Sequence, residues 1–337
     1  MLYRSRSVLF LLTAATVVVF PIDAEADEGD TIDTLSEVLA ELRKVERRPF
    51  TGTLRWKSEY RLDGAQGGDF FLTEKTKVGV ESRLTDAWRV DVKTDQTTAV
   101  GPPQGHRFVS CFDGARTVRA GYYTKDAKIP VVNLIEGESR SQEAFDPHKL
   151  AIERKAPRST LSQWLTQELE PGDRSVAEDG FSGMTARYRG AEKIDDLPVQ
   201  VVEAEFRQAG KPESEVRSRW VFFLAPDRDW LPVRAEFWGY KWTTEFPMST
   251  FVLTDIVQTK DGRWLPREAV QEKFGEGFAQ RGERKRTWRE VTTVEFDPDR
   301  LIDRADLCED VLPVDGSPVY VLEDGEIVES YVEGEQD

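Results

Sequence analysis

The segment "RDWLPVRAEFWGYKW", residues 228–242, shares its core with a later segment, "GRWLPREAVQEKF", residues 262–274. Each copy of Trp-Leu-Pro follows an acidic turn and leads into residues that alternate between apolar and polar. Proline is tolerated at the first residue of a strand, where its missing N–H need not break the ladder. Because the flanking residues do not match and no third copy follows, the pair is not a solenoid repeat. We therefore interpret the motif as the start of two β-strands, with Trp230 and Trp264 closing the rim of a sheet.

Alternation of the same kind predicts strands along most of the chain. We expect them at residues 50–62, 69–81, 87–98, 106–113, 116–124, 184–193, 198–208, 215–225, 231–242, 248–259, 265–274 and 284–296. Most successive strands are joined by short turns such as Asp113-Gly114, and short connections require antiparallel neighbours. The predicted fold class is therefore mainly β, a long antiparallel meander.

Two predicted helices and one long loop interrupt this pattern. Apolar residues recur at helical spacing in residues 31–48, which end before Pro49, and in residues 159–170, where Ser159 is the expected cap. Between them, residues 125–158 contain three prolines and lack clear periodicity. A loop of this length inside a compact domain is more often a lid or binding element than a plain connection.

The first 26 residues have the pattern of an export signal. Arg4 and Arg6 precede an apolar run from Val8 to Phe20, and a small-x-small site ends at Ala26. The run is shorter than the ~20 residues that a helix needs to span a bilayer. We expect a cleaved signal peptide over 1–26 and a periplasmic or extracellular protein.

Charge limits the partners of the exported chain. The protein has 46 Lys and Arg residues against 62 Asp and Glu residues, a formal charge of −16, and the predicted signal removes two of each. Such an excess argues against nucleic acid and against anionic membrane surfaces. No segment after the signal is apolar enough to span a membrane. The sequence does not indicate an oligomeric state.

The two cysteines, Cys111 and Cys308, are far apart in the sequence. Export permits a disulfide between them, but two buried free thiols are equally ordinary. Residues 309–337 carry ten acidic side chains and no Lys or Arg, and we expect a hairpin around Asp324-Gly325 followed by a loose end. The expected domain organisation is therefore a single domain over 27–308 followed by this acidic tail.

No motif in the sequence indicates an enzyme, a metal site or a cofactor. His106 and His148 lie in different segments, and neither has a second histidine at metal-ligand spacing. The segment "GFSGM", residues 180–184, lacks the second glycine of a nucleophile elbow. We expect hydrogen-bonding histidines and a non-enzymatic protein. A hydrolase with dispersed carboxylates is the less favoured alternative.

Aromatic residues provide the strongest indication of a binding site. Strands 215–225 and 231–242 are apolar on both faces, so both faces need cover from a core, a helix or a ligand. They either form a filled core beneath the two helices or line a groove for an apolar ligand. The candidate ligand-binding residues are Trp220, Phe222, Trp238, Tyr240 and Trp242.

The segments "FFLAPDRDWLPVRAEF", "TKDGRWLPREAV" and "VSCFDGARTVRAGY" (residues 109–122), with the signal and the first helix, resemble the outer-membrane lipoprotein-sorting (LolA-like) superfamily of exported proteins. The resemblance implies a curved half-barrel whose concave face packs on the N-terminal and mid-chain helices. It also implies a hydrophobic cavity that carries lipids or acylated proteins. The leading hypothesis is therefore a lipid-binding or apolar-ligand carrier with a partly lidded groove. The alternative is an envelope interaction or scaffold protein with a filled core.

Overall fold

The structure is a computed structural model of the chain. The described residues are 34–335, except for residues 47, 49, 64–71, 99–101, 125, 140, 142, 153–154, 157, 171–172, 174–180, 209–215 and 324–325. The predicted signal peptide therefore lies outside the described residues.

Within the described residues, fifteen strands form one sheet. In chain order they are β1 (Gly52–Leu62), β2 (Leu72–Arg83), β3 (Trp88–Thr98), β4 (Gln104–Phe112), β5 (Arg116–Tyr122), β6 (Val131–Glu136), β7 (Phe181–Ile194), β8 (Leu197–Gln208), β9 (Val216–Ala225), β10 (Leu231–Gly239), β11 (Ser249–Gln258), β12 (Trp264–Phe274), β13 (Arg286–Asp297), β14 (Pro318–Glu323) and β15 (Glu326–Val332). The order across the sheet is β15-β14-β6-β5-β4-β3-β2-β1-β13-β12-β11-β10-β9-β8-β7. The predicted class, a mainly β protein built on an antiparallel meander, is confirmed.

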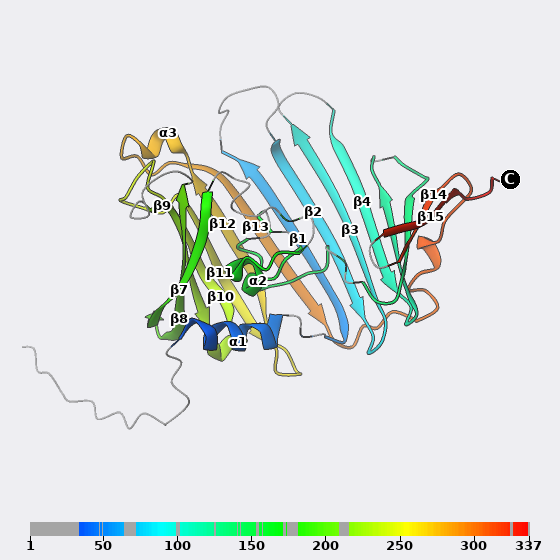
Figure 1. The fold of residues 1–337 in the computed structure, drawn as a ribbon, viewed down its shortest axis with the longest axis horizontal. Coiled ribbons are helices and arrows are strands. Elements are labelled where there is room, and N and C mark those ends of the chain that lie inside the picture. Colours follow the sequence, from blue (N-terminus) through cyan, green and yellow to red (C-terminus); the bar gives the residue numbers. More distant parts are fainter. Residues whose placement is uncertain are drawn as a thin grey trace, which may run out of the picture. The chain divides into compact units, whose positions relative to one another are not determined.

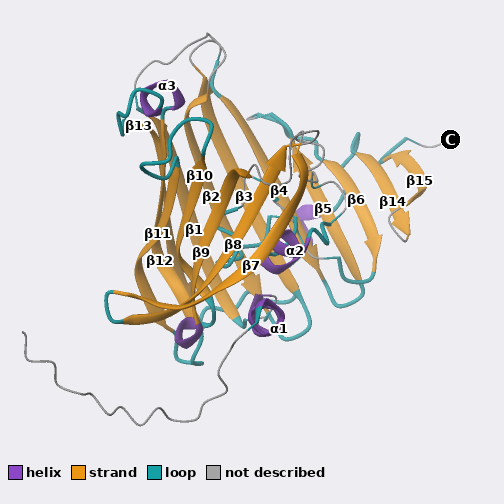
Figure 2. Ribbon diagram, turned by 60° about the vertical axis from the view of Figure 1, so that its left-hand side comes forward, coloured by secondary structure: helices purple, strands orange, loops and turns teal. Residues whose placement is uncertain are grey.

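The first strand, β1, lies in the middle of the sheet, and one half of the sheet lies on each side of it. Strands β1 to β6 run to one side as hairpin neighbours. The chain then crosses to the far edge, and β7 to β13 return until β13 pairs with β1. The sheet is curved, and the crossover between β6 and β7 passes over its concave side (Figures 1 and 2).

Two predicted helices are present, and both are shorter than expected. Helix α1 (Leu35–Glu46) buries Val38, Leu39 and Leu42, and its first turn is closed by reciprocal bonds between Thr34 and Glu37. Helix α2 (Leu161–Thr166) lies on the concave side of the sheet (Figure 2). A helix with one apolar stripe buries that stripe against the sheet and leaves the opposite side polar.

The cap of α2 is Thr160 rather than Ser159. Thr160 Oγ1 accepts from the Gln163 amide, and the Gln163 side chain accepts from the Thr160 amide, which completes a capping box. The Ser159 hydroxyl donates instead to Asp173 over 2.6 Å. Three one-turn helices occur elsewhere in the described chain, at Pro226–Arg228, Glu276–Ala279 and Glu309–Val311.

The meander departs from the prediction at one place, the segment 125–158. Strand β6 lies within it and pairs antiparallel with β5 and parallel with β14. Strands β14 and β15 form the predicted C-terminal hairpin, which thereby extends the same sheet. A parallel neighbour needs a long connection, and here that connection is most of the chain. Pairing between such distant segments is not visible in local periodicity.

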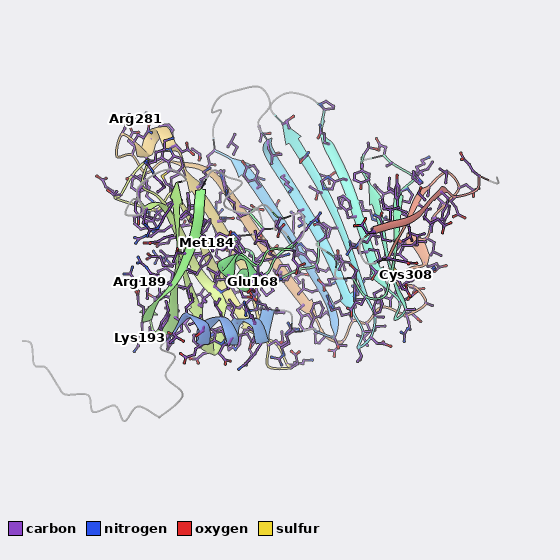
Figure 3. The ribbon with its side chains drawn as sticks, in the orientation of Figure 1. Glu168, Met184, Arg189, Lys193, Arg281 and Cys308 are labelled. Carbon is purple, nitrogen blue, oxygen red and sulfur yellow. A yellow bond between two sulfur atoms is a disulfide. The ribbon has the colours of Figure 1, made fainter. Side chains whose placement is uncertain are left out.

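Cys111 and Cys308 form a disulfide, with their Cα atoms 5.7 Å apart (Figure 3). Cys111 belongs to a buried cluster on β4, β5 and β6 that also includes Val311 and Val319. The disulfide therefore ties the segment before β14 to the face of the strands that β14 extends.

The two Trp-Leu-Pro copies lie next to each other at one corner of the sheet. Asp229 and Trp230 both adopt left-handed backbone angles, with φ of 51° and 57°. The Trp264 amide donates to Asp229 Oδ2 over 2.7 Å, and the Arg228 guanidinium lies 3.8 Å from the centre of the Trp264 ring. The motif starts two strands, as predicted, and it also joins their two starting turns.

Candidate functional site

Trp220 and Phe222 lie together on the concave side, under helix α2. Their rings stack with centroids 5.7 Å apart, and Trp164 of α2 packs on both, at 6.2 and 5.7 Å. Phe222 is 0 % exposed and Trp220 is 7 % exposed. In this structure α2 therefore covers the patch, and a ligand would reach these two rings only if Trp164 moved.

The other three aromatic candidates do not join this patch. Trp238 pairs with Arg219 on the opposite face of the sheet, where the Arg219 guanidinium lies 5.4 Å from the Trp238 ring and 5.5 Å from the Tyr240 ring. Strand β10 ends at Gly239, so Tyr240 and Trp242 belong to the following turn rather than to the strand. Trp242 packs on Gly239, on the side of β10 that carries Phe237 rather than Trp238, so the five candidates do not form one site.

Ion pairs surround Trp238 and Tyr240 on that outer face. Glu203 is 2 % exposed and accepts from Arg187 at 2.6 Å and Arg189 at 3.0 Å. Burial tends to raise the pKa of Glu203, but bonds from Arg187 and the charge of Arg219 outweigh it and lower the pKa. On this face, arginines bond to Glu203 and lie over the rings of Trp238 and Tyr240.

The concave side of β4, β5 and β6 contains a cavity of about 770 Å³, which we call the large cavity. The segment 138–170 forms its other wall. Its apolar side chains include Phe108, Tyr123, Ile135 and Leu322. Its charged ones are of both signs: Arg119, Lys149, Arg158, Glu138, Glu143, Asp146 and Glu170. Ligand sites commonly have volumes of about 300–1,000 Å³ and combine apolar walls with a few polar groups, so this cavity has the size and lining of such a site.

A buried polar cluster anchors the crossover segment to both helices. Glu46, at the end of α1, accepts from the Ser162 amide over 2.7 Å and from its hydroxyl. His148 Nε2 lies 2.7 Å from the Asp229 carbonyl oxygen, and Nδ1 lies 3.5 Å from Asp146 Oδ1. The cluster thus joins α1, α2, the crossover and the first Trp-Leu-Pro corner.

The pKa values of His148 and Glu46 are both raised, for different physical reasons. Burial opposes charge on His148, but the bond and charge of Asp146, with the Asp229 carbonyl, raise the pKa of His148 above its ordinary value. The pKa of Glu46 is raised mainly by burial and then by the nearby charge of Asp146. The surroundings of His148 therefore favour its protonated form beside the buried Asp146 carboxyl group, whereas burial favours the neutral form of Glu46.

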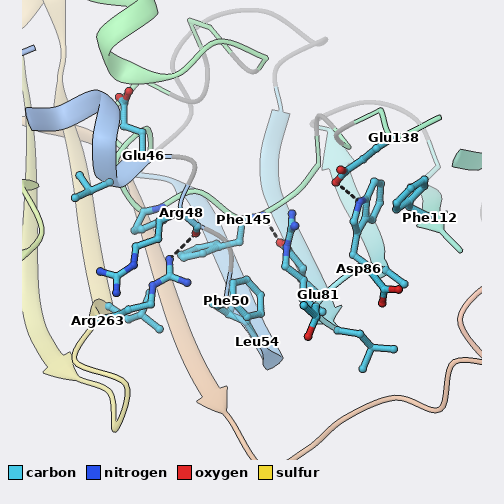
Figure 4. A pocket seen from close by; sticks show the side chains of 18 of the residues that line it. Glu46, Arg48, Phe50, Leu54, Glu81, Asp86, Phe112, Glu138, Phe145 and Arg263 are labelled. Carbon is cyan, nitrogen blue, oxygen red and sulfur yellow. Dashed lines mark hydrogen bonds and ion pairs between the residues drawn. The ribbon is translucent and has the colours of Figure 1, made fainter. Parts of the chain in front are cut away.

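A second cavity of about 340 Å³ lies beside the cluster, and we call it the arginine cavity (Figure 4). Its walls come from the end of α1 and the following loop, the β2–β3 turn, the crossover and the start of β12. Three of its lining residues are Arg48, Arg83 and Arg263, and its apolar lining includes Phe50, Leu54 and Phe145. Glu46, Glu81, Asp86 and Glu138 also line it, so the site is apolar with charged groups of both signs.

The described residues contain no group of His, Cys, Asp or Glu side chains that could hold a metal ion. None of the helices in the described part of the chain is long and apolar enough to cross a membrane. The disulfide is typical of proteins that fold in an oxidising compartment.

Several site residues could not be found from the sequence. Nothing around Glu46, Asp146 or Arg263 distinguishes them from the other charged residues of a highly charged chain. His148 was expected to be a hydrogen-bonding histidine, and it has that role. The groups that act on its charge come from distant segments. Glu46 lies 102 residues before it in the sequence, so no local spacing indicates them.

Structural comparison finds distant, fold-level similarity to proteins of the LolA superfamily and to a mycobacterial lipoprotein. A LolA superfamily protein from Nitrosomonas europaea is 12% identical, covers 83% of this chain and 100% of its own, and superposes with a TM-score of 0.37. A DUF1329 family protein from Desulfovibrio piger is 12% identical, with 80% and 93% covered and a TM-score of 0.35. The lipoprotein LppX from Mycobacterium tuberculosis is 11% identical, with 80% and 99% covered and a TM-score of 0.23.

No protein-family model matches the chain. No curated protein matches it by sequence.

Proposed function

We propose that this protein is exported and binds a lipid or another apolar ligand on the concave side of its sheet, without catalysing a reaction. The observation that carries the proposal is the large cavity between strands β4–β6 and the crossover segment. Export is supported by the N-terminal sequence pattern and by the disulfide. The periplasm or the extracellular space is the proposed location.

The energetics favour binding that can be reversed. Burying a methylene group contributes about 0.8 kcal/mol, so a long acyl chain needs only partial shelter to bind well. Immobilising the ligand and the side chains around it opposes this gain. The crossover and α2 would act as a partial lid, and the rings of Trp220 and Phe222 would become available if Trp164 withdrew. Trp238, Tyr240 and Trp242 lie outside this cavity, and their role in binding stays a prediction.

The variant Ile135→Glu tests the large cavity directly. Ile135 lines the cavity from β6. A carboxylate there should disfavour an apolar ligand, because the bound ligand would remove water from the charged group. We expect the protein purified without detergent to contain extractable lipid. We also expect Ile135→Glu to reduce retained lipid and fatty acid affinity by at least about tenfold.

Ile327→Glu is the matched control, since Ile327 is 60 % exposed on β15. It should keep the wild-type lipid content, measured by mass spectrometry, and the wild-type melting temperature. Wild-type protein that holds no lipid and shows no saturable fatty acid binding would contradict the proposal. That result would favour the filled-core interaction protein instead.

A further inference from the structure

The arginine cavity is lined by four acidic side chains and three arginines, and each carboxylate accepts a bond from a donor other than Arg263. Glu81 accepts from Arg83 Nε over 2.5 Å and from the Phe145 amide over 2.9 Å. Glu138 accepts from the Trp88 indole, and Asp86 accepts from Arg304, each over 3.0 Å. Glu46 is bonded to Ser162. The acidic side chains of the lining are thus directed at donors other than Arg263.

Arg263 is held in the cavity by a neutral partner. Its Nη2 donates to the Arg48 carbonyl oxygen over 2.9 Å. Its Nη1 is buried and has no hydrogen-bond partner among the described residues. A buried donor of a charged group without a partner is costly, and turning the guanidinium toward an anion in the cavity would satisfy it.

A second guanidinium, that of Arg83, shares the Phe50 ring as a neighbour with Arg263. The Cζ atoms of Arg83 and Arg263 both lie 5.7 Å from the centre of the Phe50 ring. Burial is the main cause that lowers the pKa of Arg263; the charges of Arg48 and Arg83 lower it further, against opposing contributions from Asp261 and Asp229. A bound anion would relieve this repulsion between like charges.

We infer that the arginine cavity binds the anionic head group, a carboxylate or a phosphate, of the ligand. Guanidinium groups match both anions geometrically and form strong charge-assisted bonds with them. Phe50, Leu54 and Phe145 provide the apolar surface against which the adjoining part of an amphiphile would lie. The inference rests on the proposed function and specifies its ligand as an anionic amphiphile.

The second Trp-Leu-Pro copy explains how Arg263 reaches this place. Arg263 directly precedes Trp264, whose amide is bonded to Asp229, and Asp229 also contacts His148 through its carbonyl oxygen. The joined starting turns of β10 and β12 therefore position the arginine at the wall that the crossover completes.

The test compares oleate with oleyl alcohol, which share a chain and differ in the charge of the head group. Equilibrium dialysis of the delipidated wild-type protein should show oleate bound about tenfold more tightly, the usual scale of a hydrogen bond to a charged group. Arg263→Gln should abolish this preference while retaining affinity for oleyl alcohol. Arg48→Gln, a change at an exposed residue, should reduce the preference and provides the same test should Arg263→Gln fail to fold.

Arg267→Gln is the matched control. Arg267 lies exposed on β12, the strand that directly follows Arg263, and it does not line the arginine cavity. It should keep the wild-type preference. Equal binding of oleate and oleyl alcohol by the wild type would overturn the inference and leave the proposed function intact, whereas failure to bind either would contradict the proposed function itself. A preference that survives both arginine variants would also overturn the inference.

Inorganic phosphate distinguishes a lipid head group from a free anion. Phosphate that raises the melting temperature of the wild type but not of Arg263→Gln, without any preference for oleate over the alcohol, would support an anion site and overturn its assignment to an amphiphile.

Discussion

His148 lies buried where the crossover, the first Trp-Leu-Pro corner and the end of α1 meet. Its ring contacts Asp146 and the Asp229 carbonyl, and the charge of Glu46 also acts on it. The groups that raise its pKa therefore come from all three elements. Since these contacts stabilise the imidazolium, His148 should make the attachment of the crossover depend on pH.

We predict that His148→Gln destabilises the protein more at low pH than at high pH. A histidine with a raised folded pKa contributes stability that is complete below its ordinary pKa, about 6.5. That stability is lost as the pH rises through the folded pKa. The difference in unfolding free energy between wild type and variant should be about 1–3 kcal/mol at pH 6 and smaller at pH 9. Urea unfolding at both pH values measures it.

His106 provides a control of opposite sign. Burial, followed by the charge of Lys75, lowers its pKa, so the wild type should gain stability relative to His106→Gln as the pH rises. A difference for His148→Gln that stays constant with pH would show that folding does not shift the pKa of His148, and would contradict the prediction.

Helix α2 contributes to the structure mainly through one side chain, Trp164. The rings of Phe206, Trp220 and Phe222 all lie within 6.2 Å of it, centroid to centroid. Six residues are too few for a helix to be stable alone, so packing and the capping box hold it in place. Loss of this packing would open the concave side above β8 and β9.

We predict that Trp164→Ala lowers the free energy of unfolding by about 3–5 kcal/mol, because it leaves a cavity among buried rings. Trp238→Ala, on the outer face, should cost about 1 kcal/mol. Denaturant titration of both variants measures the difference. Similar losses would mean that the outer-face ring is as important to packing as the covered patch.

The sheet as a whole has two halves. Strands β1 to β6 form one half from the middle outward, and β7 to β13 form the other half from the edge inward. Strand β1 joins them in the middle through β13, and the C-terminal strand β14 returns to β6 at one side. The disulfide joins residues 197 positions apart and lies next to that return. It therefore constrains the parallel pairing of β14 with β6, two strands that lie far apart in the sequence.

We predict that the double variant Cys111→Ser, Cys308→Ser loses about 2–5 kcal/mol, since the crosslink closes a very long loop in the unfolded chain. Amide hydrogen exchange should increase first in β14 and β15. Reductant should reproduce this effect in the wild type and leave the double variant unchanged. Unchanged exchange in β14 would mean that its pairing with β6 holds the hairpin without the crosslink.

Local patterns in the sequence are sufficient for most strands, both helices and the antiparallel meander. Alternation places residues on faces, and Pro232 and Pro266 correctly indicate two strand starts, because these signals depend on neighbours along the chain. The same reasoning places Trp220 with Phe222, but it groups Trp238 with them, whereas the pairing of β9 with β10 puts Trp238 on the opposite face. It extends β10 too far, to residue 242, because the turn after Gly239 continues the apolar alternation.

Long-range contacts decide the remainder. The pairing of β6 with β14, the disulfide, the covering of Trp220 by Trp164 and the convergence of Glu46, His148 and Arg263 all join segments far apart in sequence. Periodicity carries no information about which distant faces meet, because closing a long loop is favourable only when the packed result compensates its entropy. Strand positions and helix stripes can therefore be read locally, whereas the two cavities exist only once the sheet has curved and the crossover has packed against it.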